Sequence, residues 1–416
     1  MNLWHGLDET GKNKGADLKN TPLLWGLRKL NYRALALTGN YMKRTVIFLF
    51  LFSSVIATSA QKLPKKKTIL ETLQLANKYF MDKWPDAGKP IFTNIERPGN
   101  IWTRAVYYEG LMALYKIDKQ KTYYDYALQW GEKHQWGLRG GVKTRNADNQ
   151  CCAQTYIDMF LFDGKQHPER VRDIKISVDS MLLTTKIDDW NWVDALQMAM
   201  PVFVKLGNLY NDPKYFDRMY EMYAFTKTKH GDNGLYNQKE HLWWRDKDFD
   251  PPYKEPNGDD CYWARGNGWV VAALARVIEV LPKTDPHYSE YLQDFKDMCA
   301  ALLPLQRSDG YWNVSLNDPN NFGGKEVSGT SLFTYGFAWG INHGVLDKKT
   351  YLPAIVKAWN AMSKEAVHPD GKLGYVQGTG KEPKDGQPVN YDHTPDFEDY
   401  GLGCFLLAGT EIYKMK

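Results

Sequence analysis

The chain has 416 residues, a formal net charge of +4 and a hydrophobic share of 43%, which is ordinary for a soluble globular protein. Residues 1–60 hold 8 of the 53 basic and 3 of the 49 acidic residues, so the remaining 45 basic and 46 acidic residues nearly balance. This balance argues against a nucleic-acid-binding protein, and an anionic ligand would have to be bound by local groups rather than by a field of the whole protein.

Residues 42–60 have the pattern of a secretory signal peptide. Lys43 and Arg44 give a basic start, residues 46–52 are apolar, and small residues follow. The apolar run is shorter than the roughly 20 residues of a membrane-spanning helix, which argues against a stable membrane anchor. We expect cleavage before Gln61 and export to the periplasm or the medium.

Residues 1–41 precede this signal. Because a signal peptide lies at the beginning of a protein, the simplest interpretation is a start codon assigned too early, with Met42 as the true start. The alternative is a long cytoplasmic extension before a signal anchor, but the extension has no amphipathic pattern or motif. Residues 61–416 are then predicted to form one catalytic domain.

From residue 67 onward the apolar residues recur at helical spacing, and strand-like alternation is scarce. This periodicity predicts twelve helical stretches, which begin near residues 67, 101, 120, 150, 168, 190, 212, 266, 286, 328, 349 and 398.

Every second stretch is apolar on nearly all sides, as expected for helices that are buried all round. These six begin at Trp102, Gln154, Trp192, Asn267, Ser328 and Glu398. Their partners carry a charged face and should lie outside. Six inner helices alternating with six outer ones predict an all-α fold, an (α/α)6 toroid, with an open helical solenoid as the alternative. The long loops 231–262, 307–327 and 369–397 would then surround a substrate site.

Metal chemistry is not indicated. The 9 histidines are scattered, with no pair at helical spacing beside an acidic residue. The five cysteines lack the spacing of a zinc site or a disulfide scaffold, and none follows the signal as a lipid anchor would require. They are Cys151, Cys152, Cys261, Cys299 and Cys404. We expect no cofactor and no metal.

Asp194 is the first candidate for catalysis. If Asp188 or Asp189 caps the helix that follows, Asp194 lies in its second turn, between Trp190 and Met198 on an apolar face. Burial there would raise the pKa of Asp194 and favour a protonated acid near neutral pH. The alternative is a buried carboxyl group that only holds a loop by hydrogen bonds.

Asp148 is the second candidate, just before another inner helix and at the same end of the ring. A helix N-cap is the equally weighted alternative. The segment CYWARGNGWV adds Trp263, Arg265 and Trp269 around a turn that opens an inner helix. A guanidinium group and backbone amides can bind a uronate carboxylate, and indole faces can stack on a sugar ring. The alternative for Arg265 is an ion pair with a loop acid.

Two further segments carry candidate groups with plainer explanations. Trp243, Trp244 and Arg245 could line a substrate cleft or pack their own loop. Glu326 and Ser328 stand at a helix start, which indicates capping first and a polar site group second.

The segments WVDALQMAMP, WARGNGW and the aspartate of RNADNQ together resemble glycoside hydrolase family 105, the unsaturated rhamnogalacturonyl hydrolases, over most of residues 67–414. The resemblance implies an (α/α)6 fold, no metal, Asp194 as proton donor, and Asp148 as a second acidic site residue. It also implies that Trp263, Arg265 and Trp269 bind substrate. The loop histidine usual in the family has no clean counterpart here, because His241 stands out of place, and we leave it out of the site.

The run HLWWRDKDFDPPYKEPNG and the loop NFGGKE resemble the branch that acts on ulvan fragments, in which an unsaturated glucuronyl unit is joined to rhamnose 3-sulfate. The implied substrate is thus an anionic oligosaccharide, with unsaturated pectic fragments as the alternative. Other hypotheses are an inverting glycosidase that uses Asp148 as base and Asp194 as acid, a non-catalytic glycan-binding protein, and a toroidal lyase.

Overall fold

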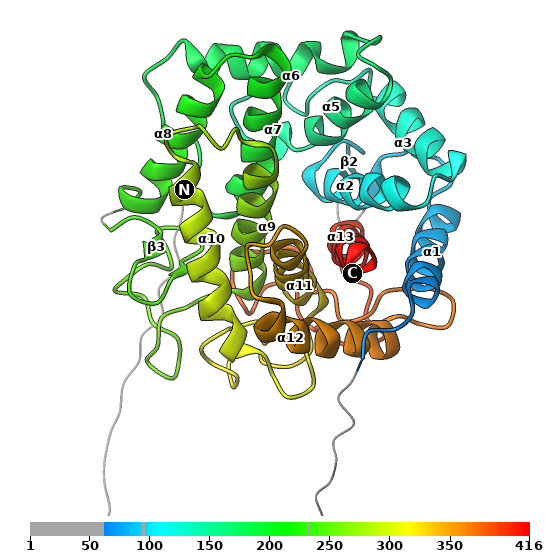
Figure 1. Cartoon of the computed structure of the whole chain (residues 1–416), viewed down its shortest axis with the longest axis vertical. Helices are drawn as coiled ribbons and strands as arrows, with labels where there is room; N and C mark the ends of the chain where they lie inside the picture. Colours follow the sequence, from blue (N-terminus) through cyan, green and yellow to red (C-terminus); the bar gives the residue numbers. More distant parts are fainter. Residues whose placement is uncertain (1–61, 93–95, 232) are drawn as a thin grey trace, which may run out of the picture. The chain divides into compact units, whose positions relative to one another are not determined.

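A computed structural model describes residues 62–92, 96–231 and 233–416 (Figure 1). The predicted extension 1–41 and the predicted signal peptide 42–60 lie outside the described residues, so both stay predictions. Among the helices of the described part, none has the length and apolar character needed to cross a bilayer.

The described chain is a ring of paired helices, so the predicted (α/α)6 toroid is confirmed (Figure 1). The inner helices are α2 (Trp102–Ile117), α5 (Ala153–Phe162), α7 (Asp194–Tyr210), α9 (Ala264–Val280), α11 (Val327–Asn342) and α13 (Asp399–Lys414). The outer helices are α1 (Lys66–Lys83), α3 (Lys121–Lys133), α6 (Glu169–Leu182), α8 (Lys214–Thr228), α10 (Tyr288–Leu302) and α12 (Lys348–Ala361). Each inner helix contacts the next, and α13 contacts α2, which excludes the open solenoid.

Short elements decorate the ring. They are the helical turn α4 (Ala147–Gln150), the segments η1 (Leu303–Leu305) and η2 (Met362–Ala366), and two hairpins formed by β1 (Ile91–Phe92) with β2 (Glu96–Arg97) and by β3 (Tyr236–Asn237) with β4 (Leu242–Trp243). Because outer helices return the chain between inner ones, all inner helices run in the same direction. Their N-terminal ends therefore gather at one mouth of the ring.

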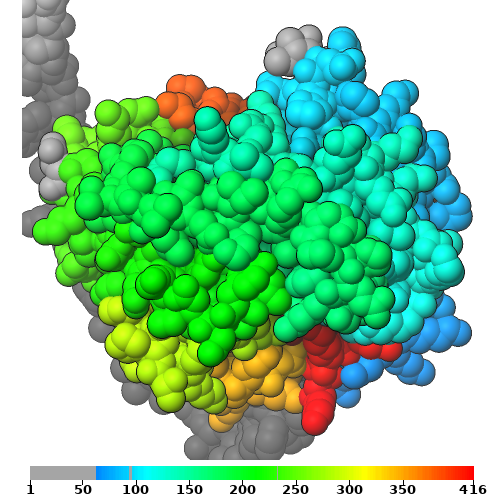
Figure 2. All heavy atoms as spheres, turned by 90° about the horizontal axis from the view of Figure 1, so that it is seen from above, coloured from blue at the N-terminus to red at the C-terminus, as the bar shows by residue number. Residues whose placement is uncertain are grey.

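The ring closes where α13 packs against α2. The Nε atom of Arg104 lies 3.0 Å from a carboxylate oxygen of Asp399, and both side chains are buried. Further along, Gly110 faces Gly403, where the backbones approach so closely that a Cβ atom on Gly403 would lie 2.3 Å from the carbonyl oxygen of Val106. In the space-filling view, the red end of α13 surfaces beside blue residues of the N-terminal part, in agreement with the contact between α1 and α13 (Figure 2).

Most of the aromatic residues pack the core. Eight tryptophans are almost completely buried, namely Trp130, Trp190, Trp243, Trp263, Trp269, Trp312, Trp339 and Trp359. The high aromatic content therefore serves packing first, and only a few rings remain available to stack on a ligand.

The start of α7 differs from the predicted one, and the structure excludes the N-cap alternative for Asp148. Helix α7 begins at Asp194 itself, not near residue 190, because Asp189 binds Arg145 and the backbone N–H of Val193 donates to the carbonyl of Arg245. These contacts hold residues 190–193 against neighbouring loops. Asp148 is not an N-cap: the side chain of Asn146 caps α4, and Asp148 lies in its first turn.

Candidate active site

A cavity of about 180 Å³ opens at the mouth formed by the N-terminal ends of the inner helices. Its walls come from the starts of α2, α4 and α7 and from two of the long loops. The lining residues are Trp102, Asp148, Trp192, Asp194, Met198, Arg245, Thr379 and Gly380. The structure thus brings together both predicted carboxylates, which are 46 residues apart in the sequence.

Asp194 is buried, with 7% of its surface exposed. One of its carboxylate oxygens accepts a hydrogen bond from Nε of Arg245 at 3.3 Å. Burial raises the pKa of Asp194 above its ordinary value, although the charges of Arg245 and Arg265 oppose that rise. The carboxyl group therefore holds a proton more tightly than an exposed aspartate does.

Asp148 shows the same effect. Burial, followed by the negative charge of Asp194, raises the pKa of Asp148 to about 7, and Arg245 and Arg139 act in the opposite direction. Two carboxyl groups that repel each other in a buried place do not both ionise readily. The pair therefore retains a proton in the neutral pH range, which suits general acid catalysis.

Arg245 is the one cationic side chain among the described residues that line this cavity. Its other side binds Asp246, and the bridge between Trp192 and Asp246 joins its loop to the segment before α7. Arg245 thus lies beside the acid pair while its position is held by the loop. The starts of α2, α4 and α7 add the positive ends of helix dipoles, which favour a negatively charged ligand.

The predicted binding residues Trp263, Arg265 and Trp269 do not line this cavity. Nη1 of Arg265 donates to the hydroxyl of Tyr400 at 2.8 Å, and Nη2 donates to the carbonyl of Gly378 at 2.9 Å. The guanidinium group of Arg265, which was expected to be free to bind a substrate carboxylate, is therefore already occupied by protein groups. Its partners are a hydroxyl group and loop carbonyls, not the loop acid that was considered as the alternative. Direct substrate contact by these three residues stays a prediction.

What these residues contact is the loop that covers the cavity. Trp263 donates through its indole N–H to the side-chain oxygen of Gln377 at 2.9 Å, and the guanidinium of Arg265 lies over the Trp263 ring. Gln377 in turn donates to the carbonyl of Asp385. This network fixes the loop that places Thr379 and Gly380 at the cavity. Trp269 packs edge-on against Trp102, one layer behind the wall.

We expect Arg265→Lys to loosen this loop. Lysine cannot reproduce the several hydrogen bonds of the guanidinium group, so kcat/KM should fall roughly tenfold to a hundredfold. Trypsin should cleave faster after the exposed Lys381 and Lys384 of the loop, which limited proteolysis with mass spectrometry measures. If KM rises with unchanged proteolysis, Arg265 instead acts by contacting the substrate.

Asp148→Asn should stabilise the protein at high pH. A folded-state pKa of about 7, above the ordinary value of 3.8, means that the folded protein loses stability as the pH rises from about 4 to 7, because the folded state retains a proton that the unfolded state releases. Asparagine removes this penalty, on the order of 4 kcal/mol at pH 8 and close to nothing at pH 4. Thermal unfolding of both proteins at the two pH values measures the difference, and equal Tm changes at both would contradict the raised pKa.

Three groups of this cavity were not among the predicted site residues. Trp102 and Trp192 offer aromatic rings, and Arg245 was considered only as a possible cleft residue. Trp102 is the first residue of an inner helix and lies at the same mouth as Asp194. The alternation of inner and outer helices could therefore have predicted that Trp102 lies near the site. His241 instead pairs with the hydroxyl of Tyr236. The side chain of Glu326 caps α11, which confirms the capping interpretation.

Among the described residues, no group of three or more His, Cys, Asp or Glu side chains is arranged to hold a metal ion. The five cysteines are buried and free. The chemistry of the site that can be derived from the structure is therefore that of the carboxyl pair, Arg245 and the aromatic walls.

Comparisons with known proteins agree with this fold. The family model described as Glycosyl Hydrolase Family 88 matches residues 72–416. A relative from Formosa agariphila, named unsaturated 3S-rhamnoglycuronyl hydrolase, is 32% identical over 76% of this chain and 85% of its own length.

Two solved structures have the same fold. A family 88 glycosyl hydrolase from Bacteroides vulgatus has a TM-score of 0.76 at 32% identity, over 84% of this chain and 99% of that chain. A protein described as a polysaccharide lyase has a TM-score of 0.74 at 32% identity, over 84% of this chain and 97% of that chain.

Proposed function

The chain belongs to glycosyl hydrolase family 88, and we propose that this glycoside hydrolase removes a 4,5-unsaturated glucuronyl residue from the non-reducing end of oligosaccharides produced by a polysaccharide lyase. The observation that carries the proposal is that Asp148 and Asp194 line one cavity beside Arg245, at the mouth where inner helices begin, with Asp194 buried and Asp148 half-buried. The pair supplies a proton near neutral pH, and its surroundings favour an anionic sugar.

An unsaturated uronate needs one strong acid rather than two carboxylates across the glycosidic bond. Its double bond belongs to an enol ether, so protonation at C4 leaves a positive charge at C5 that the ring oxygen stabilises. In the proposed mechanism Asp194 gives its proton to C4. Water then adds at C5 and returns a proton to the Asp194 carboxylate. The resulting hemiketal opens, and the hemiacetal left at C1 releases the aglycone as an alcohol.

Other groups of the cavity have supporting roles in this proposal. Asp148 accepts a hydrogen bond from a sugar hydroxyl when ionised and donates one when protonated. Arg245, whose guanidinium lies beside Asp194, attracts the C6 carboxylate of the substrate. The sugar ring stacks on the indole rings of Trp102 and Trp192. This stacking sets how far the sugar enters the cavity and places its C4 atom next to Asp194.

The finer proposal is that the substrates are ulvan fragments, in which the unsaturated glucuronyl unit is linked to rhamnose 3-sulfate. The name of the Formosa agariphila relative and the resemblance of the loop sequences support this choice. Unsaturated pectic fragments are the alternative. We also propose that the protein is exported by the signal peptide 42–60 and acts in the periplasm or the medium.

The test follows the ultraviolet absorbance of the conjugated double bond, with lyase-digested ulvan and lyase-digested rhamnogalacturonan as separate substrates. The proposal expects absorbance to fall, and the faster digest identifies the substrate. Release of sugar from a saturated glucuronide without any change in the unsaturated digests would favour the inverting glycosidase. No reaction on either kind of substrate would favour a glycan-binding protein.

A lyase is the second candidate, because a similar solved structure is described as one. A lyase would create the double bond, so absorbance would rise on undigested polymer. It also needs a base to remove the proton at C5. Among the described residues that line the cavity there is neither a tyrosine nor a histidine, which favours the hydrolase.

A further inference from the structure

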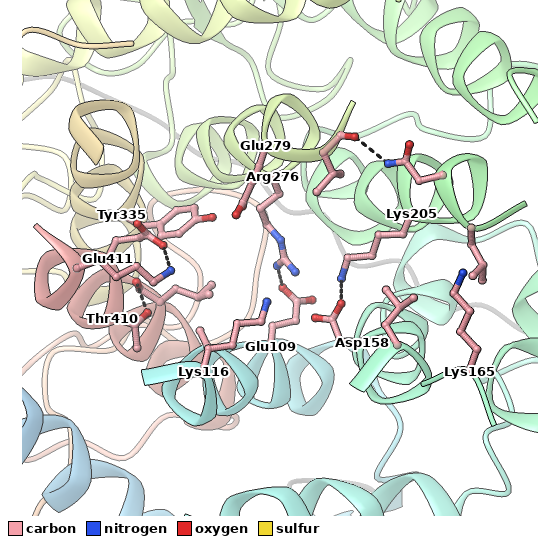
Figure 3. Close-up of a pocket in the computed structure, with 17 residues that line it drawn as sticks. Glu109, Lys116, Asp158, Lys165, Lys205, Arg276, Glu279, Tyr335, Thr410 and Glu411 are labelled. Atoms are coloured by element: carbon pink, nitrogen blue, oxygen red, sulfur yellow. Dashed lines mark hydrogen bonds and ion pairs between the residues drawn. The ribbon is translucent and has the colours of Figure 1, made fainter. Parts of the chain in front are cut away.

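A second and larger cavity, about 420 Å³, opens at the opposite mouth of the ring (Figure 3). Its walls come from the last turns of α2, α5, α7, α9 and α13, with Tyr335 of α11. Lys205 in its wall is eleven residues after Asp194 on α7, or about 16 Å along the helix axis. The two cavities are therefore separate, and this one is large enough for a monosaccharide.

Arg276 presents a free edge to this cavity. Its Nη1 atom donates to Glu109, a carboxylate that also accepts hydrogen bonds from Gln197 and Cys151. Glu109 thus holds the guanidinium in a fixed place. The Nε and Nη2 atoms of Arg276 have no hydrogen-bond partner among the described residues, and Figure 3 shows the side chain pointing into the centre of the cavity. Such an edge binds a carboxylate with two parallel hydrogen bonds.

Five cationic side chains and four carboxylates line the same cavity, so the cations are in slight excess. Lys205 donates to Asp158 at 2.6 Å, and Lys116 lies on the facing helix (Figure 3). Burial, with the like charges of Arg276 and Lys116, lowers the pKa of Lys205. Burial would raise the pKa of Asp158, but Lys205 and Lys116 outweigh it and hold that pKa below its ordinary value. A bound anion would reduce this repulsion among cations.

The other groups of the cavity without a hydrogen-bond partner are ones that can bind the hydroxyl groups of a sugar ring. The hydroxyl of Tyr335 has no hydrogen-bond partner in the described part of the chain, and one oxygen of Asp158 and the carboxylate of Glu279 are likewise without a hydrogen bond from another described residue. Cations at helix C-terminal ends often only balance the dipoles. Balancing a helix dipole would not require that a guanidinium edge without a hydrogen-bond partner face a cavity. Nor would it require that acceptors for hydroxyl groups lie unpaired in the same cavity.

We propose that the cavity at the C-terminal mouth of the ring binds an acidic monosaccharide, with its carboxylate on the free edge of Arg276 and its hydroxyls on Tyr335 and Asp158. The site is separate from the candidate active site and does not depend on which glycan is cleaved there.

The test is a ligand-observed NMR titration with D-glucuronate as probe and D-glucose as the neutral control. Wild type should bind glucuronate at least tenfold more tightly than glucose. Arg276→Lys keeps a charge for Glu109 but loses the two-pronged edge, and its Kd should rise at least tenfold. Asp148→Asn alters the opposite cavity and should leave this binding event unchanged, so it distinguishes the two mouths.

A second variant covers the case in which Arg276→Lys does not fold. Tyr335→Phe combined with Lys116→Gln removes two groups that form no hydrogen bond or ion pair with other described residues, and it should raise the Kd at least threefold. Unchanged glucuronate binding in the folded variants, loss of binding only in Asp148→Asn, or equal binding of glucose would each overturn the proposal.

Discussion

Asp194→Asn lowers kcat by about 10²- to 10⁴-fold on the unsaturated substrate, which is the contribution expected of a positioned general acid. Asparagine has nearly the same shape and can still accept the hydrogen bond from Arg245, so the cavity should keep its form. It has no proton to give to C4. The measurement is the initial rate of absorbance loss under saturating substrate, so that the change in kcat is separated from a change in KM.

The matched control is Asp188→Asn, an exposed aspartate six residues earlier that pairs with Lys186 on the surface. It should leave kcat within twofold of wild type, because surface ion pairs contribute little. Thermal unfolding and circular dichroism confirm that both variants fold. If Asp194→Asn keeps more than a tenth of the wild-type kcat, the proton comes from another group, and Asp148 with its pKa of about 7 is the first to test.

Gly403→Val should prevent stable closure of the ring. A Cβ atom at Gly403 would lie 2.3 Å from the carbonyl oxygen of Val106, and that oxygen belongs to the backbone of α2, which cannot turn away as a side chain can. The two helices would have to separate and lose buried contacts along their length. We expect a loss of about 4 kcal/mol or more in the free energy of unfolding, or insoluble protein.

Lys414→Val on the same helix is the control for this variant. It introduces the same β-branched residue at an exposed position and should cost about 1 kcal/mol or less. Urea unfolding followed by circular dichroism compares the two. A Gly403→Val protein with near wild-type stability would mean that α13 does not approach α2 as closely as the structure shows.

The fold could be predicted from the sequence because its signals are local and repeated. Six stretches without a polar face alternate with amphipathic stretches. Few folds can bury six such apolar helices on all their sides. The boundaries were less certain where tertiary contacts decide them. Asp189 looked like a cap for α7 but binds Arg145, so the helix begins five residues later.

The acidic pair could also be predicted, since an aspartate at the start of an apolar inner helix is costly unless it has a role. The position of Arg265 could not. Flanking glycines suggested an open anion site, whereas the guanidinium is enclosed by carbonyls of a loop more than a hundred residues later. Arg245 was underestimated for the same reason, because nothing in its local sequence indicates which way its loop folds.

Helix α13 is the inner helix that a ribosome makes last, yet it completes contacts with both α2 and α11. Until it emerges, the nascent chain has an unpaired apolar flank on α2 and lacks Asp399 beside the buried Arg104. Such a chain exposes apolar surface until α13 is made, and exposed surface of this kind is what chaperones protect in general. The export that we propose requires an extended chain, and a ring that cannot close before α13 is made would suit that requirement.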